Sequence, residues 1–550
     1  MSFKDSGDKE YDLCIVGSGP AGLITALEYT RLQPEHSVVI IEYGDSNTKT
    51  KNDLDDSIQV TNLTNHHEPY ECTNKGFGGT SATWGGRCVM YDEVDFVDRP
   101  IIADGCTWDL DLFRELDKYL ARSADYFECG KAVFNINEIP QFKDERVAEN
   151  FREGIVTDSV VERWSMPTRF GSRYADDIAA RPNLTVLRGY EAREFVDLQG
   201  SGHFSILKIR KIGQAELFDV KAKAFVIAAG AQESTRILLR NSQLFNLLPA
   251  LPAALGKYYQ GHLSGKIASV RFYGGATKTD YGFLRDEEGI YLRRRFQFTD
   301  KFLTENNLLN TAIWLDNPLY YDPKHRSGAM SFMYLAMLMP ILGKKLAPAA
   351  IAESITKGKR YGISRHIGNV FRQFPKSLVI PATIFYKRYL LKRKLPGVFL
   401  FSPENRYALH FHSEQIPDVS NRMELGPDRE SLVINYSLLE EDINSVIKLH
   451  KVLDNWLRET GCGELEYWYP DIDMSTAIRG MSRDGIHQSG TTRIADSPER
   501  GVVDRQLKVW GTKNVYVCSS SVFPTSSQAN PTFFLGAFAV RLAEHLTKQL

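Results

Sequence analysis

The feature that most constrains this fold is a glycine-rich turn near the N-terminus, in the run Tyr11-Asp-Leu-Cys-Ile-Val-Gly-Ser-Gly-Pro-Ala-Gly22. It joins a short apolar strand to a helix predicted over residues 23–31. Gly17 allows the tight turn, Gly19 lets the backbone approach a pyrophosphate, and Gly22 lets the strand and helix pack closely. The spacing therefore predicts a strand–turn–helix unit that binds a dinucleotide.

A carboxylate stands where such a unit would meet a ribose. The second apolar strand, residues 37–41, ends at Glu42, twenty residues after Gly22. An acid at this distance is placed to accept hydrogen bonds from both ribose hydroxyls, and it would repel a 2′-phosphate. The pattern therefore argues against NADP as the ligand.

Composition limits the classes of function. With 550 residues, 43% of them hydrophobic and 25% charged, the chain can bury cores for roughly three or four domain-sized units. The net charge of −1 gives no overall field that attracts nucleic acid, so no nucleic-acid partner is expected. None of the seven cysteines is in a Cys-x-x-Cys pair, and the polar first ten residues do not resemble a secretory signal. Reduced thiols in a cytoplasmic protein are the expectation.

Further strand and helix signals continue the nucleotide-binding pattern along the chain. Residues 76–87 contain five glycines around Trp84, as expected of backbone that lies against a flat or phosphorylated group. The patterns predict a helix over 108–126, strands within 183–196, a hairpin over 204–220, a strand over 222–231, a helix over 233–240, a strand over 514–518 and a helix over 531–549.

The fold class predicted is α/β together with α+β. A discontinuous Rossmann-like domain would take residues 1–95, 184–263 and 482–550, with 96–183 as a helical cover. A second, substrate-binding domain, residues 264–481, would be built on an antiparallel sheet with helices, because longer alternating strands such as 289–299 and 407–412 occur there.

Two clusters near the C-terminus carry candidate chemistry. They are Gly485-Ile-His-Gln-Ser-Gly-Thr-Thr-Arg-Ile494 and Pro524-Thr-Ser-Ser-Gln-Ala-Asn-Pro-Thr-Phe533. Together with the N-terminal glycines, residues 78–87 and Ala228-Ala-Gly-Ala-Gln-Glu-Ser234, they resemble the glucose-methanol-choline (GMC) flavin oxidoreductases. Five motifs occur in the order of that family, whereas the resemblance over 264–407 is poor.

The resemblance implies an FAD-dependent oxidation of an alcohol, with His487 and Asn530 in front of the flavin ring. A hydride leaves the carbinol carbon for flavin N5 as the hydroxyl proton leaves, so a base such as neutral His487 must lie at the oxygen. Asn530 can hold that oxygen without competing for the proton. The Asn-Pro-Thr sequence is similar to the pyranose oxidase branch, which implies a secondary alcohol of a sugar or sugar-like substrate, oxidised to a ketone. A lipid-linked form of that substrate belongs to the membrane hypothesis for the basic insertion at residues 330–400.

The family often carries its flavin covalently on a histidine, where this chain has Thr83 within Ser81-Ala-Thr-Trp84. The resemblance therefore implies noncovalent FAD. The residues implied to bind it are Gly17, Gly19, Gly22, Glu42, Gly79, Thr80, Trp84, Gly85, Ala192, Gly230, Ser520, Pro531 and Thr532.

Two histidine patterns are weaker. His410, His412 and Glu414 alternate along one predicted strand and share a face, which fits either two metal ligands with a carboxylate or a packed strand that faces the active site. No third histidine lies at a suitable spacing, so no metal is predicted. His66 and His67 lie in a polar stretch and are assigned no role.

A basic and apolar insertion spans residues 330–400. Residues 344–394 hold thirteen Lys or Arg against one acid, Glu353, with large apolar residues between them. The apolar run 330–343 is short and contains Pro340, so it is not expected to span a bilayer. Two hypotheses follow: an interfacial segment on an anionic membrane, which would make the protein peripheral on the inner face, or a helical cap that faces solvent or another subunit.

Three rival functions stay open. The same machinery could oxidise a lipid or sterol-like alcohol, or FAD could serve a non-redox lyase. A catalytically inactive flavoprotein scaffold is disfavoured because His487 and Asn530 are both present. The motifs do not distinguish oxygen from another electron acceptor, nor do they fix regiochemistry or oligomeric state.

Overall fold

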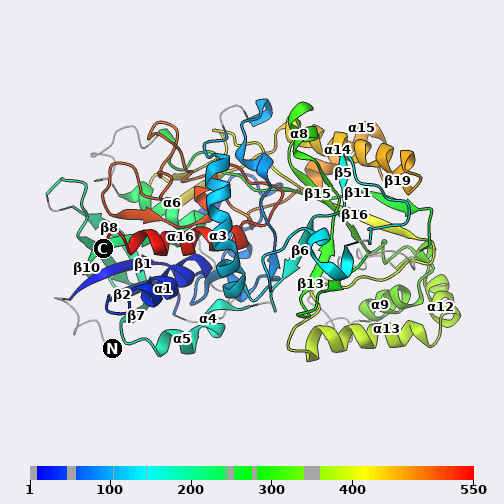
Figure 1. Cartoon of the computed structure of the whole chain (residues 1–550), viewed down its shortest axis with the longest axis horizontal. Coiled ribbons are helices and arrows are strands. Elements are labelled where there is room, and N and C mark those ends of the chain that lie inside the picture. The colour runs from blue at the N-terminus through cyan, green and yellow to red at the C-terminus, as the bar shows by residue number, and fades with distance from the viewer. Residues whose placement is uncertain are drawn as a thin grey trace.

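The computed structural model describes residues 9–45, 57–102, 105–143, 145–166, 168–197, 199–241, 243, 253–275, 281–339 and 360–550. Two lobes lie side by side (Figure 1). One is built on a seven-stranded sheet and the other around a four-stranded sheet, and each has its own large hydrophobic core. The fold is therefore a mixed α/β arrangement with several sheets.

The seven-stranded sheet draws on three distant stretches of the chain. Its order is β7-β2-β1-β10-β9-β8, with β20 also beside β10. The pairs β7–β2, β2–β1, β1–β10 and β10–β20 are parallel, and β10–β9 and β9–β8 are antiparallel. The strands are β1 (Glu10–Val16), β2 (Val38–Glu42), β7 (Leu184–Arg188), β8 (Tyr190–Val196), β9 (Ile206–Lys211), β10 (Leu217–Ile227) and β20 (Val515–Val517).

Strand β10 corrects one prediction. The second hairpin strand and the strand expected over 222–231 are a single element, Leu217–Ile227. Its first half pairs with β9 and alternates between exposed and more buried residues, whereas its second half pairs with β1 and β20 and is buried throughout its last four residues. A strand that passes from a half-solvated antiparallel edge into a covered parallel region changes its hydrophobic pattern, which made it look like two strands.

Helices α1 (Pro20–Leu32), α16 (Pro531–Leu546) and α3 (Leu110–Phe127) pack in sequence beside this sheet (Figure 1). Helix α3 begins after Asp109, whose carboxylate accepts a hydrogen bond of 2.8 Å from the Leu112 backbone N–H, as an N-cap should. Helices α1 and α16 both start at proline, the residue that tolerates the first helical position because its missing N–H would have no partner there. Helix α6 (Gly230–Arg240) follows β10.

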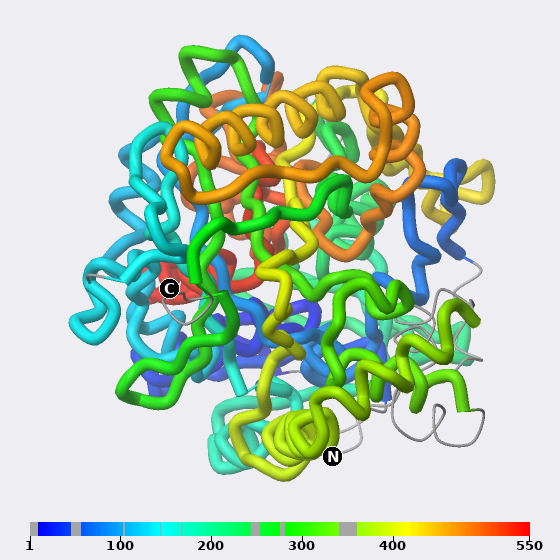
Figure 2. Tube along the Cα trace, turned by 90° about the vertical axis from the view of Figure 1, so that its right-hand side faces the viewer, coloured from blue at the N-terminus to red at the C-terminus, as the bar shows by residue number. Residues whose placement is uncertain are grey.

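The second lobe is centred on the antiparallel sheet β15-β16-β11-β19, with β15 (Thr311–Asp316), β16 (Arg406–Ser413), β11 (Leu263–Phe272) and β19 (Gly463–Tyr467). Helices α14 (Glu440–Glu459) and α15 (Asp471–Met481) pack against it. Both helices run across the upper part of the molecule in Figure 2.

The strand expected over 289–299 is two strands in different sheets. Residues Tyr291–Arg294 form β13, within the order β12 (Leu284–Arg285), β13, β6 (Val161–Trp164), β4 (Arg87–Cys88). Residues Gln297–Phe298 form β14, which pairs with β5 (Val156–Thr157). The chain breaks register at Arg295, which is buried and donates a hydrogen bond of 2.7 Å to the Gln528 side chain.

The remaining elements are shorter or peripheral. The third small sheet has the order β17 (Arg422–Leu425), β18 (Leu432–Asn435), β3 (Ile58–Val60). The other helices are α2 (Pro69–Cys72), α4 (Phe170–Arg173), α5 (Ala175–Ala179), α8 (Asp300–Glu305), α9 (Gly328–Leu338), α12 (Ile363–Arg372) and α13 (Lys376–Phe385). Within the described ranges, every helix is too short or too polar to cross a bilayer.

Candidate active site

A cavity of about 340 Å³ opens where the glycine turn after β1, residues 72–87 and the start of α16 come together. It collects fourteen of the fifteen residues that the sequence indicated. These are Gly17, Gly19, Glu42, Gly79, Thr80, Trp84, Gly85, Ala192, Gly230, His487, Ser520, Asn530, Pro531 and Thr532. The fifteenth, Gly22, lies behind the wall: a Cβ there would be 2.1 Å from the Gly17 carbonyl oxygen, which agrees with a packing role.

The glycines of the first turn serve two different needs. Gly17 has φ +99°, and a Cβ there would lie 2.5 Å from the Ala228 carbonyl oxygen, so the turn and β10 approach too closely for a side chain. Gly19 has φ −66° and no heavy atom within 4 Å of an added Cβ. Its open side is therefore space that a ligand can fill.

Three helices begin at this cavity. The N-cap residues are Gly19 for α1, Ala229 for α6 and Asn530 for α16, and none has a side chain that caps the helix. Each helix start thus presents backbone N–H groups and the positive end of its dipole toward the cavity. Convergence of such ends favours an anionic ligand such as a diphosphate.

Glu42 stands at the end of β2 and is buried. One carboxylate oxygen accepts from the Ser18 backbone N–H at 3.0 Å and from its hydroxyl at 2.5 Å, and the other accepts from the Gly44 N–H at 2.8 Å. A carboxylate has about four acceptor positions, so roughly one remains for a ligand hydroxyl. Binding both ribose hydroxyls, as expected from the sequence, would require the Ser18 hydroxyl to turn away.

The side chains of His487 and Asn530, which are 43 residues apart in the chain, are in contact at the cavity. The Asn530 side-chain amide donates to His487 Nε2 at 2.6 Å. Because Nε2 accepts this bond, the proton of the neutral imidazole lies on Nδ1. Nε2 therefore carries the lone pair that can take a proton once the Asn530 amide gives way to another donor.

Asp484 lies behind His487. Its Oδ2 is 3.6 Å from His487 Nδ1, and its Oδ1 accepts from the backbone N–H groups of Gly485, Ile486 and His487 at 2.7, 2.7 and 3.2 Å. Burial alone would raise the pKa of Asp484, but the neighbouring charge of His487 and hydrogen bonds from His262 and His487 hold it well below the usual range. A permanent negative charge thus faces the far nitrogen of the imidazole.

Two more histidines complete a cluster that the sequence did not reveal as a unit. His262 donates its backbone N–H to Asp484 Oδ2 at 2.7 Å, and its ring stacks on His412 with centroids 4.0 Å apart. His412 lies edge-on to His487 at 5.3 Å and donates from Nδ1 to the Gln528 carbonyl at 2.7 Å. Burial lowers the pKa of both His262 and His412, although the Asp484 carboxylate 3.2 Å from His262 Nδ1 acts in the opposite direction on His262.

The set proposed as a metal alternative does not converge. Glu414 makes a buried ion pair with Arg99, with oxygen–nitrogen distances of 2.7 and 2.9 Å, and His410 stacks on Trp314. Of that set only His412 reaches the site, within 4.8 Å of ligand atoms on His262 and His487. The stacked rings of His262 and His412 run nearly parallel, at 26°, which is a poor arrangement for two ligands of one ion.

His66 corrects another interpretation. It is fully buried, and its Nε2 lies 2.7 Å from the Tyr259 hydroxyl. A Cβ on Gly485 would be 2.6 Å from His66 Cε1, so His66 packs under the turn that leads to His487. Its role is to support that turn, and only the tertiary contact reveals this.

The donors and spaces of the cavity fit FAD. An added Cβ at Gly85 or Gly230, as at Gly19, would meet no heavy atom within 4 Å. Asn530 Oδ1 and both polar atoms of the Gln232 amide are buried and have no hydrogen-bond partner among the described residues. Unpaired buried polar atoms are costly, so these groups are matched to a polar ligand.

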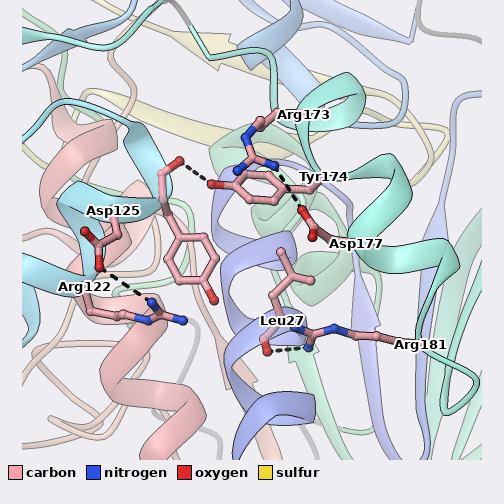
Figure 3. A pocket seen from close by; sticks show the side chains of 8 residues that line it. Leu27, Arg122, Asp125, Arg173, Tyr174, Asp177 and Arg181 are labelled. Carbon is pink, nitrogen blue, oxygen red and sulfur yellow. Dashed lines mark hydrogen bonds and ion pairs between the residues drawn. The ribbon is translucent and has the colours of Figure 1, made fainter.

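A second hollow, of about 260 Å³, lies between α1, α3 and the stretch that contains α4 and α5 (Figure 3). It is rich in charge, but its arginines are already paired: Arg173 with Asp177 at 3.0 Å, Arg122 with Asp125 at 3.6 Å, and Arg181 with the Leu27 carbonyl at 2.7 Å. Charges that satisfy one another leave little to bind a ligand, so the chemistry belongs to the first cavity.

Comparison with known proteins agrees with this site. Residues 417–539, which contain His487 and Asn530, match the family model for GMC oxidoreductase. The chain is 21% identical to 6'''-hydroxyparomomycin C oxidase from Streptomyces lividus over 99% of this chain and 93% of that protein. It is 26% identical to paromamine 6'-oxidase from Streptomyces fradiae over 139 residues, a stretch that spans only 24% of each chain. The fold is similar to that of a solved formate oxidase, with a TM-score of 0.53, 16% identity and coverage of 98% of each chain.

Fold, cavity and matches together define an FAD-dependent alcohol oxidoreductase. More specifically, the match over residues 417–539 supports the GMC oxidoreductase family. The compounds named for the two Streptomyces oxidases are substrates of those proteins, and the substrate of this chain is a separate question.

Proposed function

We propose that this enzyme oxidises a secondary alcohol of a sugar or sugar-like molecule to a ketone, with His487 as the base and Asn530 as the group that holds the substrate oxygen. The observation that carries the proposal is the contact of 2.6 Å between His487 Nε2 and the Asn530 amide at the cavity that fits FAD. The relative aligned over nearly the full chain is named an oxidase of a hydroxylated compound, which supports an alcohol as substrate.

Side chains of this protein can take up the proton that leaves the substrate hydroxyl. A substrate hydroxyl that enters between the two side chains donates to His487 Nε2 in place of the Asn530 amide, and that amide then donates to the substrate oxygen. As the proton arrives, the Asp484 carboxylate, 3.6 Å from Nδ1, stabilises the imidazolium. Bound FAD would supply the acceptor for the hydride.

FAD would bind noncovalently between the glycine turn, Glu42 and the start of α16, in a unit made of residues 1–95, 184–263 and 482–550. In support, Thr83 is not among the residues that line the cavity, and its hydroxyl donates to the Thr80 carbonyl. Acid precipitation tests this point. The proposal expects yellow FAD in the supernatant, and flavin that stays with the pelleted polypeptide would contradict it.

Anaerobic mixing with a panel of free sugars, nucleotide sugars, glycosides and lipid alcohols tests the reaction. At least one sugar-like secondary alcohol is expected to bleach the flavin absorbance and to yield a ketone. Bleaching by lipid or sterol-like alcohols alone would overturn the substrate class. Turnover of a substrate without any bleaching would indicate a lyase, and no response across a panel with FAD bound would indicate an inactive flavoprotein.

A further inference from the structure

A helical segment at the edge of the second lobe turns its apolar side outward. It consists of α12, α13 and the turn through residue 394, and it lies at the lower margin of the molecule in Figures 1 and 2. We call these residues, 360–394, the basic hairpin. The upstream basic residues Lys344, Lys345, Lys357 and Lys359, the acid Glu353 and the apolar residues 340–343 lie outside the described residues.

Helix α12 exposes its apolar side chains and buries polar ones, the opposite of a typical helix in a soluble domain. Ile363, Ile367 and Phe371 recur every four residues and are 41%, 43% and 74% exposed. The buried positions are polar: His366 Nδ1 lies 3.0 Å from the Ser331 hydroxyl, and the Asn369 amide donates to the Pro323 carbonyl at 3.0 Å. A helix of a soluble domain normally buries its apolar stripe, so this stripe is built to meet an apolar surface outside the lobe.

Helix α13 and the turn after it extend the same surface. Ser377 is the one buried residue of α13, whereas Phe374, Val379, Phe385 and Leu390 are all well exposed. The apolar side chains of the basic hairpin that are more than half exposed are Tyr361, Phe371, Phe374, Val379, Tyr386 and Leu390. Exposure of so many large apolar side chains within one short segment marks an interaction site.

The charge around this surface has one sign. Residues 360–394 contain nine Lys or Arg and no Asp or Glu. Arg388 and Arg393 donate to backbone carbonyls, while the exposed cations form no ion pair with any described residue. The exposed cations are Arg360, Arg365, Arg372, Lys376, Lys387, Lys392 and Lys394.

We propose that the basic hairpin is a docking surface for an anionic lipid bilayer, which would make the enzyme a peripheral membrane protein. Exposed aromatic and aliphatic side chains would enter the headgroup boundary while the cations around them meet lipid phosphates. A second copy of the chain fits less well, because a symmetric contact would bring seven exposed cations against seven like charges. The inference is independent of the substrate.

Vesicle sedimentation of the holoenzyme tests whether the basic hairpin binds an anionic bilayer. The protein is expected to bind vesicles of phosphatidylcholine mixed with phosphatidylglycerol at least about tenfold more tightly than phosphatidylcholine alone, and high salt should weaken the binding. Two variants should each lower the affinity for the anionic vesicles by about tenfold or more. One is Phe371→Ser with Phe385→Ser, and the other is Arg372→Glu with Lys376→Glu and Lys387→Glu.

Matched changes elsewhere are the control. Ile472→Ser, at a side chain that is 87% exposed on α15, and Lys301→Glu, at one that is 83% exposed on α8, should leave binding unchanged. All variants should keep the thermal midpoint and flavin content of the parent, so a loss of binding reports the surface. Equal binding to both kinds of vesicle, no binding, or no loss in the hairpin variants would overturn the proposal. Lipid-free dimerisation that Phe371→Ser abolishes would assign the surface to a second copy instead.

Discussion

At the scale of single residues, the group that most changes the interpretation of the site is Asp484. One of its oxygens holds the backbone of the turn through Gly485, Ile486 and His487, and the other faces His487 Nδ1. It therefore acts through His487 as a positioning residue rather than on the substrate. The Asp-Gly dipeptide was a visible signal for this turn, but the contact with His262 joins residues that are 222 positions apart.

Replacing the carboxylate tests that role. Asp484→Asn should keep an oxygen for the turn but lose the charge behind the imidazole, so kcat should fall by about tenfold, the factor that 1.4 kcal/mol of lost stabilisation gives. The KM and the flavin content should stay close to those of the parent, because Asp484 faces His487 and does not line the cavity.

The readouts separate this role from a structural one. His487→Gln should lose about 10²- to 10⁴-fold in kcat with FAD still bound, as expected when a general base is removed. If Asp484 were purely structural, Asp484→Asn would show reduced stability and flavin content with an unchanged kcat per bound flavin, and that pattern would contradict the assignment.

At the scale of elements, the turn between β1 and α1 was predictable because its glycines follow local rules. The start of α16 was predicted at its observed position because proline marks the first helical residue, whereas the helix predicted from residue 23 begins at Pro20. Strand β10 and the pair β13 and β14 were misjudged because periodicity reports burial, and burial changes along one strand when its neighbours change. The reversed face of α12 was hidden for a related reason: periodicity locates an apolar stripe but not the side it faces.

Two neighbouring glycines provide a paired test of the turn. Gly17→Ala puts a Cβ 2.5 Å from the Ala228 oxygen at φ +99°, so it should lower the free energy of unfolding by about 1–3 kcal/mol. Gly19→Ala meets no protein atom within 4 Å and should preserve stability, but its methyl group occupies ligand space, so the FAD dissociation constant should rise at least about tenfold.

Apoprotein stability and FAD titration distinguish the two effects. If Gly19→Ala bound FAD as tightly as the parent chain, the cavity wall at the first turn would not be the diphosphate site. If Gly17→Ala were as stable as the parent, the close approach to β10 would be wrong.

At the scale of the whole molecule, buried neutral histidines make stability depend on pH. Burial lowers the pKa of His450 in α14 to about 4. Below about pH 6.5, His450 becomes protonated in the unfolded chain but stays neutral in the folded chain. The free energy of unfolding therefore falls as the pH drops from 6.5 to 4, and this contribution is fully retained above pH 6.5. This residue alone accounts for about 3 kcal/mol across that window.

The variant His450→Gln tests the sign and size of this pH-dependent contribution to stability. The variant loses the edge-on contact with Phe411, so it should be somewhat less stable than the parent at pH 7.5. The gap should narrow as the pH is lowered and reverse near pH 4, as measured by urea unfolding at a series of pH values. A gap that is constant with pH would show that His450 titrates normally in the folded chain.

The whole-molecule arrangement explains which parts of the site could be foreseen. The motifs that contribute Gly17, Glu42, His487 and Asn530 are local, so their residues were identifiable although the chain separates them widely. His262 lies just before β11 and His412 lies in β16, outside the motifs of the family resemblance, and only the tertiary packing brings them beside His487. The substrate side of the cavity was unpredictable for the same reason.

A crystal structure of the holoenzyme tests the central claim most directly. The account predicts FAD along the glycine turn and Glu42, with the reactive nitrogen of its ring facing His487 Nε2 and Asn530 across a gap that one hydroxyl-bearing carbon can fill. FAD bound elsewhere, or a ring whose reactive nitrogen points away from both side chains, would contradict it.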